Sequence, residues 1–174
     1  KGLNIPIWLL GSSLYSARLA GVLGLPFAFA SHFAPDLLDD AIDTYHRNFR
    51  PSQFLDAPYT MVSINAFVAD TDDEGEFLAS SLYQQFLGMI RGKRGKTPAP
   101  TNMDELWNEE EKKQVLHTLK YTFAGSKETV YKQIMEFIAQ RRAVDEIMVN
   151  GPIYDQEKRR KSFELLAQSF KEQA

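Results

Sequence analysis

Short apolar runs alternate with amphipathic stretches along this chain, and the alternation predicts strands interleaved with helices. The runs have the length of strands and lie at Pro6–Leu10, Pro26–Ala30, Thr60–Val68 and Glu146–Val149. The first run is unbroken, which favours a parallel strand covered on both faces. Strands that alternate with helices predict an α/β fold rather than an α+β fold.

Between these runs, apolar residues recur at spacings of three and four, as they do on the buried side of a helix. The expected helices begin near Leu14, at Pro35, after the capping box Thr71–Glu74, at Leu106, at Lys127 and after Asp155. Ser126 is the expected N-cap of the helix over 127–140.

Small polar residues separate the first apolar run from the first helix. Gly11, Ser12 and Ser13 break the run, and either serine can cap the helix that starts near Leu14. The first N–H groups of a helix and the positive end of its dipole attract anions, so this position favours a phosphate. The alternative is a plain helix cap, because neither GxGxxG nor GxxxxGK[ST] is present.

The order of the pieces LLGSS, YSA, GLPFAFA and HF within Ile5–Phe33 resembles the bacterial luciferase-like flavin monooxygenases. Met61–Glu74, Phe123–Val130 and Asp145–Asp155 resemble later parts of the same family. The family folds as (β/α)8 barrels, so the resemblance implies an α/β chain that forms the C-terminal half of a TIM barrel, strands five to eight with their helices. A whole barrel needs about 250 residues, and this chain has 174.

The resemblance therefore implies one α/β unit over residues 1–174, either as a fragment or as a natural half-barrel that pairs with another half. An open parallel sheet leaves strand edges free to pair. The expected partners are accordingly a missing N-terminal half or further copies of the chain in a homo-oligomer.

The resemblance also implies chemistry. FMN, in the reduced form supplied by a separate flavin reductase, and O2 would oxygenate a small organic substrate. Gly11, Ser12, Ser13 and Ser16 would hold the FMN phosphate, with Tyr15 beside it. Catalytic residues stay unknown and the isolated chain is expected to be inactive, because relatives supply acid–base residues and arginines from the other half. The alternative is a noncatalytic flavin-binding half-barrel or assembly protein.

Residues 91–104 begin with RGKRGKTPAP, whose cations, glycines and prolines do not favour regular structure. We expect a mobile loop there. It is either a solvated loop or, as the resemblance implies, a lid over the flavin site. The cations are not interleaved with aromatic residues and the chain is acidic, so no nucleic acid is expected as a partner.

Composition changes this picture little. The chain has 44% apolar and 25% charged residues, a net charge of -3 and no cysteine. No apolar run is long enough to cross a membrane, so a cytoplasmic protein without a membrane partner is expected. Of the three histidines, only His32 follows a strand; no metal site is expected, since no metal-ligand spacing occurs. His32 is expected to lie beside the flavin ring without a chemical role.

Overall fold

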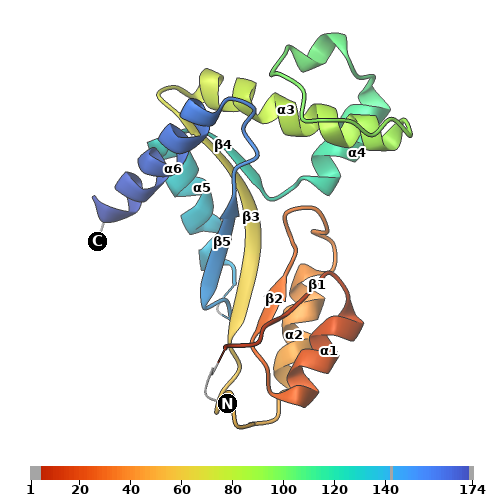
Figure 1. The fold of residues 1–174 in the computed structure, drawn as a ribbon, viewed down its shortest axis with the longest axis vertical. Helices are drawn as coiled ribbons and strands as arrows, with labels where there is room; N and C mark the ends of the chain where they lie inside the picture. The colour runs from red at the N-terminus through yellow and green to blue at the C-terminus, as the bar shows by residue number, and fades with distance from the viewer. Residues whose placement is uncertain (1–4, 142, 173–174) are drawn as a thin grey trace. The chain divides into compact units, whose positions relative to one another are not determined.

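The computed structural model describes residues 5–141 and 143–172. The chain divides into two compact units, one comprising residues up to Ile64 with Gln140–Met148 and the other comprising Asn65–Ala139 with the residues from Val149 onward. Strand β3 (Thr60–Ala69) and strand β5 (Glu146–Asn150) lie side by side and pair (Figure 1). Both strands contribute residues to both units. Strands that alternate with helices and pair in parallel confirm the predicted α/β fold.

The first unit contains β1 (Leu9–Gly11), α1 (Leu14–Leu23), β2 (Phe27–Phe29) and α2 (Leu38–Asn48). β2 lies between β1 and the start of β3 and pairs in parallel with both. The largest fully buried side chains of the described residues include Phe27, Phe29 and Tyr45 of this unit. The Tyr45 hydroxyl donates to the Leu25 carbonyl and accepts from the Tyr59 amide, both at 3.0 Å, so it joins α2 to the ends of two strands.

The prediction for the first apolar run is wrong in its bounds and its burial. The strand covers Leu9–Gly11 rather than Pro6–Leu10, and Ile5, Ile7 and Leu10 are 69%, 54% and 65% exposed. Among the described residues, β1 pairs with β2 alone. The run is as apolar as a strand that is covered on both faces, but the described part of the chain buries only some of its side chains.

The second unit contains α3 (Asp72–Ile90), the 3-10 turn η1 (Met103–Glu105), α4 (Glu109–Thr118), β4 (Thr122–Ser126), α5 (Lys127–Ala139) and α6 (Gln156–Lys171). β4 pairs in parallel with the end of β3, from Asn65 opposite Thr122 to Ala69 opposite Ser126. The core of the second unit includes Phe67, Leu78, Leu82, Val115 and Leu119.

Two elements of this unit differ from the prediction. Thr122–Ser126 forms strand β4, which is not among the four predicted strands, whereas the helix expected from Lys127 does begin there. The short sequence of β4 carries no alternating pattern, and the partner that makes it a strand lies far away in the sequence. The helix expected from Leu106 begins at Glu109, because Asn108 and Glu111 form a capping box there.

Residues 91–102 have no regular structure, as predicted, and only 103–105 form a turn of 3-10 helix. The segment is nevertheless tied to α3. Gln84 donates to the Ala99 carbonyl and Gln85 to the Thr97 hydroxyl, both at 2.8 Å. The Thr101 amide donates to Ser80 Oγ at 2.9 Å. Mobility of this segment and a role as a lid stay predictions.

Within residues 5–141 and 143–172, no helix combines the length and the apolarity needed to cross a bilayer.

Candidate functional site

The predicted phosphate-binding residues lie where β1 ends and α1 begins. β1 ends at Gly11, and Ser13 caps α1 with an extended backbone, at φ -139° and ψ 159°. The N–H groups of Leu14 and Tyr15 lie in the first turn and have no acceptor within the helix. This helix start therefore offers hydrogen-bond donors at the carboxyl end of a strand, where α/β folds bind ligands.

Ser13 and Ser16 form a pair of hydroxyl groups at this helix start. The Ser16 amide donates to Ser13 Oγ at 3.3 Å, and the Ser16 hydroxyl donates to the Ser13 carbonyl at 2.7 Å. The two hydroxyl oxygens are 3.2 Å apart. The first turn of α1 contains no acidic residue, so no carboxylate of that turn opposes an anion here.

Gly11 allows the strand to approach this hydroxyl pair. A Cβ atom on Gly11 would lie 2.1 Å from Ser16 Oγ and 2.4 Å from Ser16 Cβ. The Gly11 carbonyl accepts from the Ala30 amide at 2.9 Å, which joins the ends of β1 and β2. A side chain at position 11 would thus displace Ser16, and the sequence alone did not indicate this reason for the glycine.

The structure brings three of the five predicted residues, Gly11, Ser13 and Ser16, into direct proximity. Ser12 and Tyr15 are both exposed, Tyr15 by 76% of its surface. Their predicted roles, a phosphate contact for Ser12 and packing beside the flavin for Tyr15, stay predictions.

Ser31 and His32 follow β2 at the same edge of the sheet. Ser31 is fully buried and its hydroxyl donates to the Ser63 carbonyl at 2.5 Å. Burial lowers the pKa of His32 from its usual value, which favours the neutral imidazole. It packs edge-on against Phe33, with the ring centres 4.6 Å apart. A neutral imidazole can donate or accept a hydrogen bond at this edge.

The other two histidines lie on helices and do not follow a strand. His46 of α2 contacts the Thr60 hydroxyl at 3.0 Å through Nε2, and His117 lies in the last turn of α4. In the part of the chain that the structure describes, no three His, Cys, Asp or Glu side chains gather in a way that could hold a metal ion.

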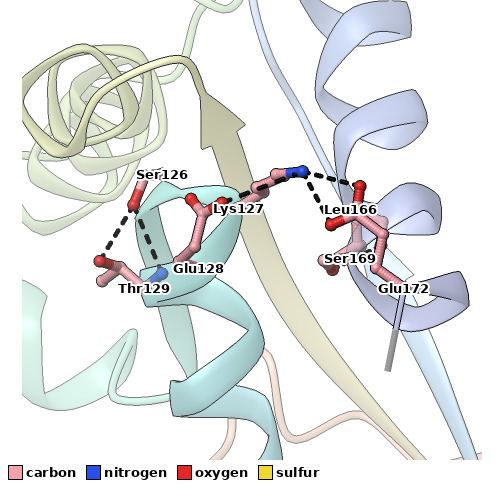
Figure 2. A network of polar contacts seen from close by, with 7 residues as sticks. All are labelled: Ser126, Lys127, Glu128, Thr129, Leu166, Ser169 and Glu172. Carbon is pink, nitrogen blue, oxygen red and sulfur yellow. Dashed lines mark hydrogen bonds and ion pairs between the residues drawn. The ribbon is translucent and has the colours of Figure 1, made fainter. Parts of the chain in front are cut away.

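The start of α5 is a second helix start with serine, and its surroundings are different. Ser126 Oγ contacts Thr129 Oγ1 at 3.1 Å, and Lys127 forms an ion pair with Glu172 at 2.8 Å (Figure 2). The Ser126 amide donates to Asp72 Oδ1 at 2.7 Å. This bond and weaker ones from Ser126 and Thr129 lower the pKa of Asp72. A carboxylate of the chain therefore already occupies this helix start, which sequence reasoning missed because Asp72 is distant in the sequence.

The sequence matches the family described as luciferase-like monooxygenase over residues 1–146. A protein named luciferase-like monooxygenase from Escherichia coli (strain K12) is 49% identical over 165 residues, which are 94% of this chain and 49% of that protein. The chain spans about half the length of the curated relatives it matches.

Solved structures give a similar result. The crystal structure of apo-MsnO8 superposes with a TM-score of 0.76 at 29% identity, covering 94% of this chain and 50% of that one. The coenzyme F420 dependent tetrahydromethanopterin reductase from Methanopyrus kandleri has a TM-score of 0.60 at 15% identity, covering 95% of this chain and 50% of that one. The second similarity concerns the fold alone.

Proposed function

We propose that this chain, which belongs to the luciferase-like monooxygenase family, binds the phosphate of FMN at the start of α1. Gly11, Ser12, Ser13 and Ser16 would contact the phosphate, and Tyr15 would pack beside it. The observation that carries the proposal is the hydroxyl pair of Ser13 and Ser16, set 3.2 Å apart at a helix start without an acid in its first turn. Hydroxyl and backbone N–H donors at such a position suit a dianionic phosphate.

The reaction we propose is oxygenation of a small organic substrate. Reduced FMN, delivered by a separate flavin reductase, would supply the reducing power that O2 activation needs. This chain's own residues would bind and orient the phosphate end, and neutral His32 would hold a hydrogen bond at the same sheet edge. The 91–104 segment would close over the site and exclude water. A cytoplasmic location belongs to the same proposal.

We further propose that the chain supplies strands five to eight of a TIM barrel. Its relatives are about twice as long, and three apolar side chains at or before β1, Ile5, Ile7 and Leu10, are exposed. A first half, or another copy of the chain, would cover them and complete the flavin site. Binding of FMN by this chain alone is therefore expected to be weak.

The second candidate is a noncatalytic flavin-binding half-barrel or assembly protein. The exposed apolar residues of the β1 region favour it, because an edge of this kind suits association with another chain. The two candidates differ in turnover once a first half is added, since only the monooxygenase would then oxidise a substrate.

The test compares two substitutions of Ser13 by phosphorus NMR titration with FMN. Ser13→Asp keeps a helix-capping oxygen but places a negative charge at the proposed phosphate position. Ser13→Asn keeps the cap without the charge. A like charge a few ångströms from the phosphate should lower FMN affinity by about tenfold or more. Equal binding by the two variants would overturn the phosphate assignment.

A further inference from the structure

A cavity in the second unit, open to solvent, shares no lining residue with the predicted phosphate site. Its volume is about 550 Å³, and it is lined by α3, by residues 101–107 and by α4. This volume lies in the range typical of pockets for small organic ligands. Its walls combine aromatic side chains, among them Tyr83 and Trp107, with two carboxylates, Glu76 and Asp104.

Hydrogen bonds of the backbone fix these walls. The Thr101 amide donates to Ser80 Oγ at 2.9 Å, and Ser80 Oγ donates in turn to the Phe77 carbonyl at 2.6 Å. The Asp104 amide donates to Asn102 Oδ1 at 3.1 Å. The cavity is therefore formed by a segment that is anchored to α3, and a ligand does not have to organise it first.

The aromatic wall already holds a cation of the chain itself. The Lys112 ammonium lies 5.8 Å from the centre of the Trp107 ring and 3.6 Å from the Asp104 carboxylate. Trp107 also packs against Tyr83, with the ring centres 5.9 Å apart. An ammonium group near an electron-rich ring and a carboxylate is the arrangement by which proteins bind organic cations.

The second carboxylate has no such partner. Glu76 is an exposed residue of α3; partial burial of its carboxyl group raises its pKa, while a hydrogen bond from Tyr83 opposes the shift. Among the described residues, no cation forms an ion pair with Glu76. A ligand cation at this position would supply the missing positive charge, whereas a ligand anion would meet repulsion from Glu76 and would have to compete with Asp104 for Lys112.

We propose that the cavity lined by Glu76, Tyr83, Asp104, Trp107 and Lys112 binds a small organic ammonium, a protonated amine with an aromatic or aliphatic body. Its apolar part contacts Trp107 and Tyr83, and its ammonium group lies between the aromatic wall and Glu76. The site shares no residue with the proposed phosphate position at α1, but residues 101–104 of its wall belong to the segment proposed as a lid.

The first experiment titrates the 174-residue chain with three probes of similar shape and different charge. They are phenethylammonium, neutral 2-phenylethanol and anionic 3-phenylpropionate. The chain has 2 tryptophans, so the indole N–H signal of Trp107 is assigned in an NMR spectrum by its loss in Trp107→Phe. Phenethylammonium should shift this signal saturably and bind about threefold to fivefold more tightly than the alcohol, with the carboxylate weakest. Equal binding of the ammonium and the alcohol, or no saturable shift, would overturn the proposal.

Variants locate the charge that matters. Glu76→Gln should lower the affinity for phenethylammonium about threefold, to near that of the alcohol. Glu105→Gln removes the same charge from a nearby residue that does not line the cavity, and it should change the affinity little. Lys112→Ala should raise the affinity, because the ligand no longer competes with an internal ammonium. If the two glutamine variants behave alike, or Lys112→Ala weakens binding, the site is not an ammonium site.

Discussion

The starts of α1 and α5 share a serine that accepts a hydrogen bond from the amide three residues later, yet their electrostatics are opposite. At α1 the Ser16 amide donates a hydrogen bond to Ser13 Oγ, and the first turn has no acidic residue. At α5 the Thr129 amide likewise donates a hydrogen bond to Ser126 Oγ. Here, however, Glu128 lies in the first turn, and Asp72 accepts a hydrogen bond from the Ser126 amide. The start of α1 thus leaves N–H donors for an external anion, whereas at the start of α5 a carboxylate of the chain itself already accepts a hydrogen bond.

The comparison shows that a serine before a helix does not by itself indicate a phosphate site. Helix dipole and free N–H groups are present at every helix start. The neighbouring residues decide whether those donors are free, and at α5 the deciding neighbour is far away in sequence. At α5 the neighbour is the first residue of α3, whereas at α1 it is Gly11, which carries no charge and leaves space for Ser16.

Gly75→Ala is expected to have the largest effect, because a side chain at this position would push α3, which carries Asp72, away from the start of α5. A Cβ atom on Gly75 would lie 2.3 Å from the Gly125 amide nitrogen and 2.5 Å from its Cα atom. Backbone atoms cannot yield as a side chain does, so unfolding free energy should fall by about 2–3 kcal/mol. Chemical denaturation measures this loss. Gly95→Ala, where no atom lies within 4 Å, is the control, and an equal loss there would contradict the explanation.

Gly11→Ala tests the other helix start. Its Cβ atom would displace the Ser16 hydroxyl, which lies 2.1 Å from that position. Weak FMN binding should fall by about tenfold as the hydroxyl pair is lost, since a charge-assisted hydrogen bond is worth about 1.5–3 kcal/mol. Phosphorus NMR of FMN measures the affinity. Unchanged binding would mean that the pair does not contact the phosphate.

Asp72→Asn should make the start of α5 more similar to that of α1. Hydrogen bonds hold the pKa of Asp72 below its usual value of 3.8, so its contribution to stability is present above that pH and disappears as the pH falls through the lower folded-state pKa. The melting temperature of the wild type should therefore drop more steeply in acid than that of the variant. Parallel acid profiles of the two proteins would show that the bond to Ser126 does not stabilise the fold.

Glu111→Gln separates the acid sensitivity that comes from Asp72 from the acid sensitivity that comes from Glu111. Hydrogen bonds from Arg91 and Asn108 lower the pKa of Glu111 to about 2, from a usual value of 4.5. The wild type thus gains stability from this carboxylate above pH 4.5 and loses it as the pH falls toward 2. Melting curves across this range should show a flatter profile for the variant. A double variant with Asp72→Asn should be flatter still, and a profile no flatter than that of Asp72→Asn alone would contradict the assignment.

The local parts of this structure were predictable from sequence, and the long-range parts were not. The caps at Thr71 and Asp155 follow from residue type and position, and the structure confirms both; for α1 the sequence left Ser12 and Ser13 open, and the cap is Ser13. Strand β4 was missed because its five residues become a strand only by pairing with the end of β3. The exposure of Ile5 and Leu10 was missed because an apolar composition indicates that a strand can be buried, but it does not show which elements of the chain cover it.

The candidate site divides in the same way. Ser12 and Ser13 were identified from a strand, a break and a helix, all within a dozen residues, whereas Ser16 came from the family resemblance. The reason for Gly11, the internal anion at α5 and the cavity beside Trp107 each depend on pairs of residues that only the folded chain brings together. Family resemblance indicated which ligand to expect but could not supply residues that relatives carry in their other half.

The most direct test of the central claim compares FMN with riboflavin, which has the same ring system and no phosphate. Titration of the wild-type chain with each ligand, followed by phosphorus and proton NMR and run beside native mass spectrometry, gives affinity and assembly state together. The α1 phosphate site predicts that FMN binds about tenfold or more tightly than riboflavin and that Ser13→Asp removes the difference. Equal affinities for the two ligands, or a difference that survives in Ser13→Asp, would contradict it.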